Sequence, residues 1–545
     1  ALQSTGGTGF VLLEHLSRLG VGISSLVSLG DKDDVSGTDM LRWWASDKDT
    51  KLALLYLESV RNPRKFARTT RGVARTMPVL TVNVGRSATG QRLAGARAAT
   101  ATPQLTRQAL AGQAGVIAAA NLGELLDTAA LLASQPVPAG GRVAVVSNTR
   151  GGAVLAADAC ADAGLQVARL AEVTVRALRE VLPREAMLAG PVDTTLLVAP
   201  GAFRACLELA GADPGVDAVL ALTATAASGD LVPQVSAARL TVPIAAAVMD
   251  QVEVVRLLPG PGEDHPAVPA YAYPESAARA LGHAARYGSW RAAPPGRIPD
   301  LDGLRPDRAK ELIVGLLADA PAGGWLSRHQ AAELLGCYGL PLPEGIEASS
   351  EDAAVTAAAR FGGPVAVKAE VPGLMRTSDA GTLVPGLHDG DHVRRGFRSL
   401  QQAFGGQMTV IVQPVSAGGA EVTISVLHEQ IFGPLVLIGL AAEGVGALAD
   451  RAARIAPLTD ADADDLIRSV PGAPLLTGRR GTPAADLAAL RDMLLRVSRM
   501  VDDLPQIAEL ELSPVTASPD GARVIDAQIR IQAAEPTDAY LRRLP

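Results

Sequence analysis

Two glycine-rich segments of similar design carry the residues best suited to hold a phosphoryl group. Their polar and glycine positions are Ser4, Thr5, Gly6 and Gly7 in the first segment, and Ser147, Asn148, Gly151 and Gly152 in the second. Each precedes a stretch whose apolar periodicity favours a helix, so free backbone N–H groups would lie at the positive end of a helix dipole. Two such loops could converge on one anion. The alternative for each is a tight strand-to-helix turn that needs glycine for its backbone alone.

The elements that must position these loops repeat along the chain. Residues 143–146 predict a strand before the second loop, and both helices end ahead of a glycine, Gly20 or Gly164, before another apolar strand. Further strands are predicted at residues 51–57, 77–84, 218–225 and 243–248, and further helices at 121–134 and 275–291. A strand, a glycine loop, a helix and a glycine cap are the opening of a doubly wound α/β unit. We therefore expect two such domains, 1–134 and 137–295, joined by a linker rich in proline and glycine.

A break at residues 294–296 is followed by a different rhythm. A helix is predicted at 327–338 and strands at 365–369, 409–414 and 421–427, alternating with charged loops. This pattern is typical of an α+β domain that holds a ligand between two lobes, and we assign it residues 296–545. The polar stretch 459–469 contains neither proline nor glycine, which predicts a helix surface rather than a linker.

Composition excludes several classes of function. The 545 residues include 50 basic and 57 acidic ones, a net charge of -7, without a basic block, which argues against nucleic acid as the main partner. Every candidate apolar run is interrupted before the ~20 residues of a membrane span. Three widely separated cysteines indicate inert buried thiols in a reducing compartment, so we expect a soluble, cytoplasmic protein. Because the chain opens like a strand end entering a loop, we also expect it to be the remainder of something longer.

Several segments together resemble a known family over essentially the whole chain. The segments QSTGG, SLGDKDDV, LYLE, SNTRGG, IFGPLVLIGL, IAPLTDADA and AELELSPV are similar to those of the NDP-forming acyl-CoA synthetases, relatives of succinyl-CoA synthetase. The resemblance implies two flavodoxin-like CoA-ligase domains at 1–134 and 137–295, an ATP-grasp domain at 296–545, and a CoA-binding domain upstream that is absent here. The family phosphorylates a histidine from ATP, passes the phosphoryl group to a carboxylate, and lets CoA displace it.

The resemblance also implies roles for individual residues. The two glycine loops match the family's phosphate-cradling helices, and Glu58 matches the glutamate that orients the phosphorylated histidine; an ordinary strand end is the alternative for Glu58. The expected nucleotide-binding residues are Lys368, Gln413 and Glu421, and the expected magnesium ligands are Glu511 and Asp526. For Glu511, together with Glu509, the alternative is a solvated strand face.

The chain departs from the family at the residues that carry the phosphoryl group. The histidine position falls near Ala96 or Arg97, and none of the seven histidines lies in this segment. Alanine has no nucleophile and the arginine guanidinium stays protonated, so the relay is broken. Further departures are Arg376-Thr377-Ser378 where many relatives have His-Lys-Thr, Ala441-Ala442 for Gly-Gly, Ser513 for Asn and Gln528 for Arg.

Three functions of different class follow from these observations. We expect first a degenerate, regulatory module that binds nucleotide or acyl-CoA, as in the synthetase-like regions of bacterial Gcn5-type protein lysine acetyltransferases. The second is an active ADP-forming acid–CoA ligase with another phosphoryl carrier, or with direct formation of an acyl phosphate. The third is a structural scaffold without ligands.

The expected cofactors are ATP or ADP with weakened Mg²⁺ binding, and CoA or acyl-CoA. The expected partners are the upstream domain and an acetyltransferase domain, and a homo-oligomer is compatible with the sequence.

Overall fold

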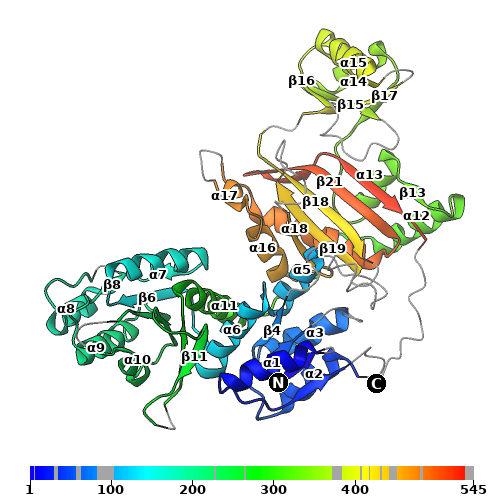
Figure 1. Cartoon of the computed structure of the whole chain (residues 1–545). Coiled ribbons are helices and arrows are strands. Elements are labelled where there is room, and N and C mark those ends of the chain that lie inside the picture. The colour runs from blue at the N-terminus through cyan, green and yellow to red at the C-terminus, as the bar shows by residue number, and fades with distance from the viewer. Residues whose placement is uncertain are drawn as a thin grey trace. The chain divides into compact units, whose positions relative to one another are not determined.

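The computed structural model divides the chain into two compact units, Ala1–Pro295 and Gly296–Pro545 (Figure 1). The residues it describes are 1–4, 7–29, 35–56, 63–82, 104–188, 190–225, 229–262, 265–370, 383–404, 408–415, 418–429, 433–440, 451–478 and 483–533. The boundary between the units falls where the sequence breaks at 294–296, ahead of the expected ATP-grasp domain.

The first sheet of the first unit is parallel and runs in the order β2-β1-β3-β4-β5. Its strands are β1 (Leu2–Ser4), β2 (Leu26–Ser28), β3 (Ala53–Leu55), β4 (Val79–Val82) and β5 (Ile117–Ala119). Its helices are α1 (Thr8–Arg18), α2 (Gly37–Ser46), α3 (Pro63–Ala74), α5 (Gln104–Ala114) and α6 (Leu122–Ser134). The order reverses between β1 and β3, which are neighbours in the sheet, and Ser4 is the last residue of β1 at this point. Ligands bind at such switch points in doubly wound sheets.

The second sheet of this unit runs in the order β11-β12-β10-β9-β6-β7, with β8 paired to β6. Its strands are β6 (Arg142–Ser147), β7 (Gln166–Val167), β8 (Val192–Asp193), β9 (Ala218–Thr223), β10 (Ile244–Val248), β11 (Val255–Leu258) and β12 (Val268–Tyr271). Its helices are α7 (Arg150–Asp162), α8 (Glu172–Val181), α9 (Pro200–Gly211), α10 (Val232–Ala237) and α11 (Pro274–Ala292). The strand β11 is antiparallel to β12, and the other described pairs of this path are parallel.

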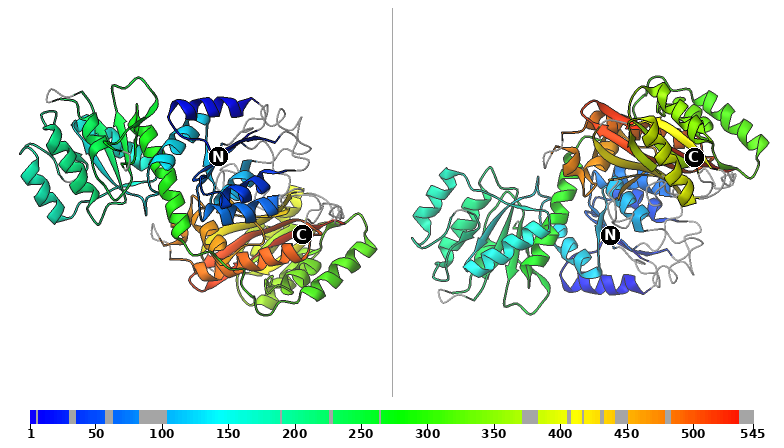
Figure 2. Two further views of the ribbon diagram at one scale, coloured as in Figure 1. Left: turned by 90° about the horizontal axis from the view of Figure 1, so that it is seen from below. Right: turned by 90° about the horizontal axis from the view of Figure 1, so that it is seen from above.

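Helices α6 and α11 join the two sheets of the first unit. Figure 2 shows α11 lying between the sheets beside α6. The hydroxyl of Tyr271 donates to the carbonyl of Asp127 at 2.8 Å, and that of Tyr287 donates to the carbonyl of Ala74 at 2.7 Å. Arg75 lies 4.4 Å from the ring centre of Trp290. The two sheets are therefore connected by buried hydrogen bonds as well as by apolar packing.

The second unit contains a large sheet in the order β13-β23-β21-β18-β19-β20, with β22 paired to β21, and a smaller sheet in the order β14-β17-β15-β16. The strands are β13 (Gly324–Trp325), β14 (Ile346–Ala348), β15 (Val365–Glu370), β16 (Leu383–Leu387), β17 (Thr409–Pro414), β18 (Ala420–Glu429), β19 (Gly433–Leu440), β20 (Arg451–Ile455), β21 (Ile507–Ser518), β22 (Gly521–Val524) and β23 (Ala527–Ile531). The helices are α12 (Pro306–Asp319), α13 (Arg328–Gly336), α14 (Glu351–Phe361), α15 (Gly390–Phe404), α16 (Asp460–Arg468), α17 (Ala473–Leu476) and α18 (Leu487–Asp503). The sequence-based expectation of two lobes agrees with these sheets, each of which buries one apolar face under helices.

The cysteines behave as the sequence predicts. Cys160, Cys206 and Cys337 are all buried and unpaired. Burial raises the pKa of the Cys160 and Cys206 thiols to about 12, which keeps them protonated and unreactive. Within the described part of the chain, no helix combines the length and the apolar character needed to cross a membrane.

Candidate functional site

The first glycine loop places an unsatisfied hydroxyl beside an uncapped helix. Ser4 ends β1, is only 1% exposed, and its Oγ has no hydrogen-bond partner among the described residues. Gly7 precedes α1, and among the described residues no side chain caps the start of that helix. A Cβ on Gly9 would lie 2.6 Å from the Cβ of Ser4, so a glycine is needed for this close approach of helix and strand. Thr5, Gly6 and Glu58, the other predicted site residues of this domain, lie outside the described residues.

The polar side chains of the second glycine loop have hydrogen-bond partners within the loop or at a neighbouring strand end. The hydroxyl of Ser147 donates to the Thr149 carbonyl at 2.9 Å, and Thr149 Oγ1 accepts from the Gly152 N–H at 3.2 Å. The side chain of Asn148 donates to the Ala224 carbonyl at 2.8 Å and accepts from its N–H at 2.9 Å. Asn148 thus ties the end of β6 to the end of β9. Phosphate binding by Ser147 and Asn148 stays a prediction.

The two glycines of this loop, Gly151 and Gly152, differ in how much room a side chain would have. A Cβ on Gly152 would lie 2.4 Å from Leu222 Cδ2, whereas a Cβ on Gly151 would meet no atom within 4 Å. The amide of Gly152 is the one that Thr149 caps. Gly152 therefore serves the packing of α7 against β9, and Gly151 borders open space where a ligand could approach the backbone.

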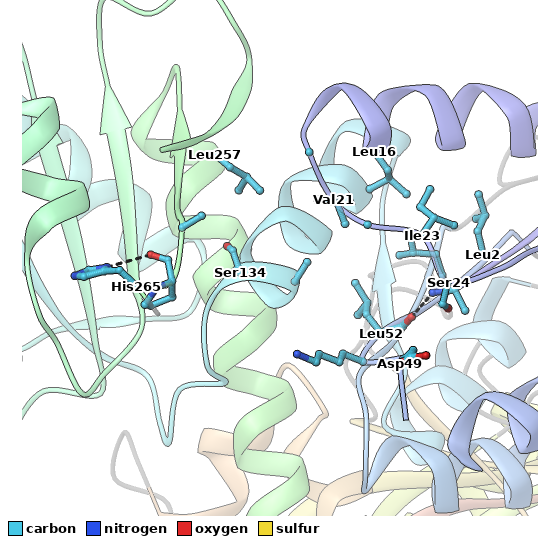
Figure 3. Close-up of a pocket in the computed structure, with 18 residues that line it drawn as sticks. Leu2, Leu16, Val21, Ile23, Ser24, Asp49, Leu52, Ser134, Leu257 and His265 are labelled. Carbon is cyan, nitrogen blue, oxygen red and sulfur yellow. Dashed lines mark hydrogen bonds between the residues drawn. The ribbon is translucent and has the colours of Figure 1, made fainter. Parts of the chain in front are cut away.

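A pocket of about 430 Å³ in the first unit lies away from these loops. Figure 3 shows Leu2, Leu16, Ile23 and Leu52 on one side of it and His265 on the other. These residues surround the amino ends of β1 and β3, whereas Ser4 is at the carboxyl end of β1. The pocket is therefore separate from the predicted phosphate site.

In the second unit, Lys368 and Asp526 meet. Along β15, Val365, Val367 and Ala369 belong to the core under α14 and α15, so Lys368 points to the opposite face of the small sheet. There its Nζ forms an ion pair with Oδ2 of Asp526, which lies just before β23 of the large sheet. Both side chains are about 90% buried. Two residues predicted from segments far apart in the sequence are brought together.

A second cation completes this cluster. Nη1 of Arg328, the first residue of α13, donates to Oδ1 of Asp526 at 3.2 Å. Each oxygen of Asp526 therefore contacts a different cation, and the three side chains carry one net positive charge. Sequence reasoning missed Arg328 because its partner is 198 residues away and no local motif marks the pair.

The other two predicted nucleotide-binding residues, Gln413 and Glu421, differ in their surroundings. Gln413 faces Ala366 in the register of β15 and β17, which puts it on the same face as Lys368. Its side chain is 3% exposed, and Oε1 has no hydrogen-bond partner among the described residues. Glu421 is exposed near the start of β18, opposite Thr516. Gln413 thus presents a buried unsatisfied acceptor, whereas Glu421 stands at the surface.

The predicted magnesium ligands Glu511 and Asp526 lie in different surroundings. Glu511 lies opposite Ser425 and Gln528 on the polar face of the large sheet, and the hydroxyls of Ser513 and Thr423 are 3.0 Å apart. Among the described residues, no group of three or more His, Cys, Asp or Glu side chains could hold a metal ion. Mg²⁺ in nucleotide sites commonly takes one or two carboxylates and completes its shell with phosphates and water. Asp526 has both oxygens in ion pairs, and magnesium binding by Glu511 and Asp526 stays a prediction.

The segments of the phosphoryl relay are not among the described residues. Ala96 and Arg97, Arg376, and Ala441 and Ala442 all lie outside them.

Comparisons with known proteins agree with this architecture. Residues 2–132 match the succinyl-CoA ligase like flavodoxin domain, and residues 317–531 match an ATP-grasp domain. The chain is 31% identical to acetate–CoA ligase (ADP-forming) I of Archaeoglobus fulgidus, over 96% of this chain and 76% of that protein. It is 28% identical to 4-hydroxybutyrate–CoA ligase (ADP-forming) of Nitrosopumilus maritimus, over 97% and 77%. The expected α/β fold class, with a flavodoxin-like CoA-ligase domain at the amino-terminal end and an ATP-grasp domain after it, is confirmed, and the second CoA-ligase domain at 137–295 stays a prediction.

A solved structure is also similar in part. The dinucleotide-forming acetyl-coenzyme A synthetase 1 of Ca. Korarchaeum cryptofilum, in complex with phosphate and ADP, is 24% identical over 53% of this chain and 64% of that one. The TM-score is 0.48.

Proposed function

This chain belongs to the family of ADP-forming acyl-CoA ligases, and from that membership we propose that it binds adenine nucleotide at the Lys368 cluster without forming a phosphohistidine. Its first unit would hold the phosphate-bearing end of a CoA or acyl-CoA ligand near Ser4. In this proposal the chain is a regulatory binding module that retains the family's fold and not its phosphoryl relay.

The contact of Lys368 with Asp526 carries the proposal. A carboxylate between two cations leaves one net positive charge in a site that is about 90% buried, where the attraction for a phosphate is stronger than in water. The unsatisfied Oε1 of Gln413 on the same face could accept a hydrogen bond from the exocyclic amine of adenine. Satisfying such a buried acceptor is worth about 1–3 kcal/mol.

The missing histidine supports the loss of the relay. A phosphoramidate forms when a neutral imidazole nitrogen attacks the γ-phosphorus and ADP leaves. The segment that matches the family's histidine, around Ala96 and Arg97, contains no histidine. Among the described histidines, His283 is buried with its two ring nitrogens bonded to Glu124 and Arg286, so it is not available as a substitute.

An active ligase is the second candidate. Two relatives that the chain matches over more than three quarters of their length are named as ADP-forming ligases, and the Lys368–Asp526 pair is present in this chain. In this candidate a substrate carboxylate attacks the γ-phosphorus of ATP directly, ADP leaves, and the CoA thiolate then displaces phosphate from the acyl phosphate. ADP release that depends on both an organic acid and CoA would distinguish this candidate from the binding module.

Pairing with a lysine acetyltransferase domain remains part of the regulatory proposal. The mass and the amino-terminal sequence of the full-length gene product test it. A product without an additional acetyltransferase segment would remove that partner from the proposal and leave nucleotide binding intact.

Calorimetric titration with Mg·ADP tests nucleotide binding. Because the ion-paired Nζ of Lys368 would hold a phosphate by a charge-assisted hydrogen bond worth about 1.5–3 kcal/mol, Lys368→Ala should raise the Kd roughly 10- to 150-fold. The control is Lys310→Ala, which removes an exposed lysine on α12 of the same unit and should leave the Kd unchanged. Equal affinities of wild type and Lys368→Ala, with both proteins folded by circular dichroism, would reject the proposed site.

A further inference from the structure

Arg328 occupies a position where several parts of the second unit meet. It is the first residue of α13, which Ser327 and Gln330 cap reciprocally. Its side chain is 11% exposed and makes two directed contacts, from Nη1 to Oδ1 of Asp526 at 3.2 Å and from Nη2 to the carbonyl of Pro343 at 2.9 Å. A planar guanidinium can hold two acceptors in a fixed relation, which a flexible ammonium cannot.

The carbonyl of Pro343 belongs to the strap at residues 341–345, which leads into β14 of the small sheet. A Cβ on Gly345 would lie 2.6 Å from Nε of Arg328 and 2.8 Å from Cγ2 of Ile411 on β17. The guanidinium is therefore packed against the strap where it enters the small sheet. Ile411 is the neighbour of Lys368 in the register of β15 and β17. One side chain thus links the strap, Asp526 and, through Asp526, the ammonium of Lys368.

We propose that Arg328 is a positioning residue of the nucleotide site: it holds Asp526 and the strap so that Lys368 faces the nucleotide phosphates. This inference rests on the proposed binding of nucleotide at Lys368. Arg328 does so without touching the nucleotide itself.

Charge explains why this arrangement matters for phosphate binding. With Arg328 present, Asp526 shares its two oxygens between two cations, and the cluster keeps one net positive charge. Without Arg328, both oxygens of Asp526 are available to Lys368, so the charge of the ammonium is neutralised and the net charge of the cluster falls to zero. Attraction for a phosphate then decreases, and the decrease grows with the number of phosphates on the ligand.

Titration of the full chain with Mg·ADP and with AMP tests the inference. We expect Arg328→Gln to raise the Kd for Mg·ADP about tenfold and the Kd for AMP by a smaller factor. Arg328→Lys, which keeps the charge but loses the two-acceptor geometry, should give an intermediate Kd. The control is Arg308→Gln. Arg308 lies on α12 and forms an exposed ion pair with Glu333 of α13, the helix that also carries Arg328, so this variant should leave both Kd values unchanged.

A double-mutant cycle separates positioning from general damage to the fold. If Arg328 acts in part through Lys368, the loss of Mg·ADP affinity caused by Arg328→Gln should be smaller in the Lys368→Ala background than in wild type, whereas independent effects would multiply. A folded Arg328→Gln protein that binds Mg·ADP as wild type does, or multiplied effects in the cycle, would overturn the inference. Wild-type protein that binds no Mg·ADP would overturn the proposed function and this inference with it, so the two failures are distinguishable.

Discussion

At the scale of single residues, Asp127 is a carboxyl group whose burial sets a pH dependence. It lies on α6 beside α11, and burial raises its pKa to about 6, with a smaller contribution from Glu124; Ser276 and Arg279 act in the opposite direction. The ordinary pKa of an aspartate is near 4. The folded protein therefore binds more protons than the unfolded chain between about pH 4 and 6. The stability that Asp127 contributes is present below this window and is lost as the pH rises through it.

Asp127→Asn should remove this loss. At about 1.4 kcal/mol per pKa unit, we expect the variant to be more stable than wild type at pH 7.5 by up to about 2–3 kcal/mol, with no gain near pH 4.5. Chemical unfolding of both proteins at pH 4.5, 6 and 7.5 measures the difference. Asp158→Asn, which changes an exposed carboxylate on α7, is the control and should show no such trend. A wild-type protein as stable as Asp127→Asn at pH 7.5 would contradict the assignment.

The residues of the nucleotide site show how far the sequence alone can lead. Lys368 and Asp526 were predicted from their local segments, and the structure brings them into contact. The sequence could not predict that contact or the role of Arg328, because the pairs span 158 and 198 residues and depend on how two sheets meet. It also could not predict that the amide of Asn148 bonds to Ala224, since that contact joins two strand ends 76 residues apart.

At the scale of elements, each glycine segment needs a glycine at one position because a helix approaches a strand closely there. Gly152 packs against Leu222, and Gly9 packs against Ser4 in the corresponding place of the first sheet. Neither sequence segment distinguishes the packed glycine from its neighbours. Long periodic helices and buried strands were predictable because their patterns are strong, as at α6, α11, β9 and β10. The strand expected after Gly164 is present as β7, whereas the short strands β8, β11 and β12 were not predicted, because two to four residues carry too little pattern.

Adjacent glycines of α7 provide a matched test of this packing. Gly152→Ala would place a Cβ 2.4 Å from Leu222 Cδ2, so we expect a loss of about 1–3 kcal/mol in the free energy of unfolding. Gly151→Ala meets no atom within 4 Å and should stabilise the helix by up to about 1 kcal/mol. Thermal unfolding of the two variants beside wild type gives the comparison. Equal stability of the two variants would show that the helix can move away from β9 at no cost.

At the scale of the whole molecule, each unit by itself carries part of the proposed function. The first unit presents the buried hydroxyl of Ser4, which has no partner in the described part of the chain, near the start of α1, and the second presents the cationic cluster around Asp526. The order of domains was predictable from the resemblance of motifs, and the matches at 2–132 and 317–531 agree with it. The subdivision of the first unit at residues 134–137 remains a proposal, consistent with a separate sheet on each side.

The central claim is that the chain holds nucleotide without becoming phosphorylated on histidine. Equilibrium dialysis of the full chain against γ-labelled Mg·ATP, followed by denaturation at alkaline pH where phosphohistidine survives, tests both parts in one measurement. We expect the label to accumulate on the side of the folded protein and to be lost completely on denaturation, because Ala96 and Arg97 cannot carry a phosphoryl group. Label that remains on a histidine after denaturation would contradict the account and establish a working relay.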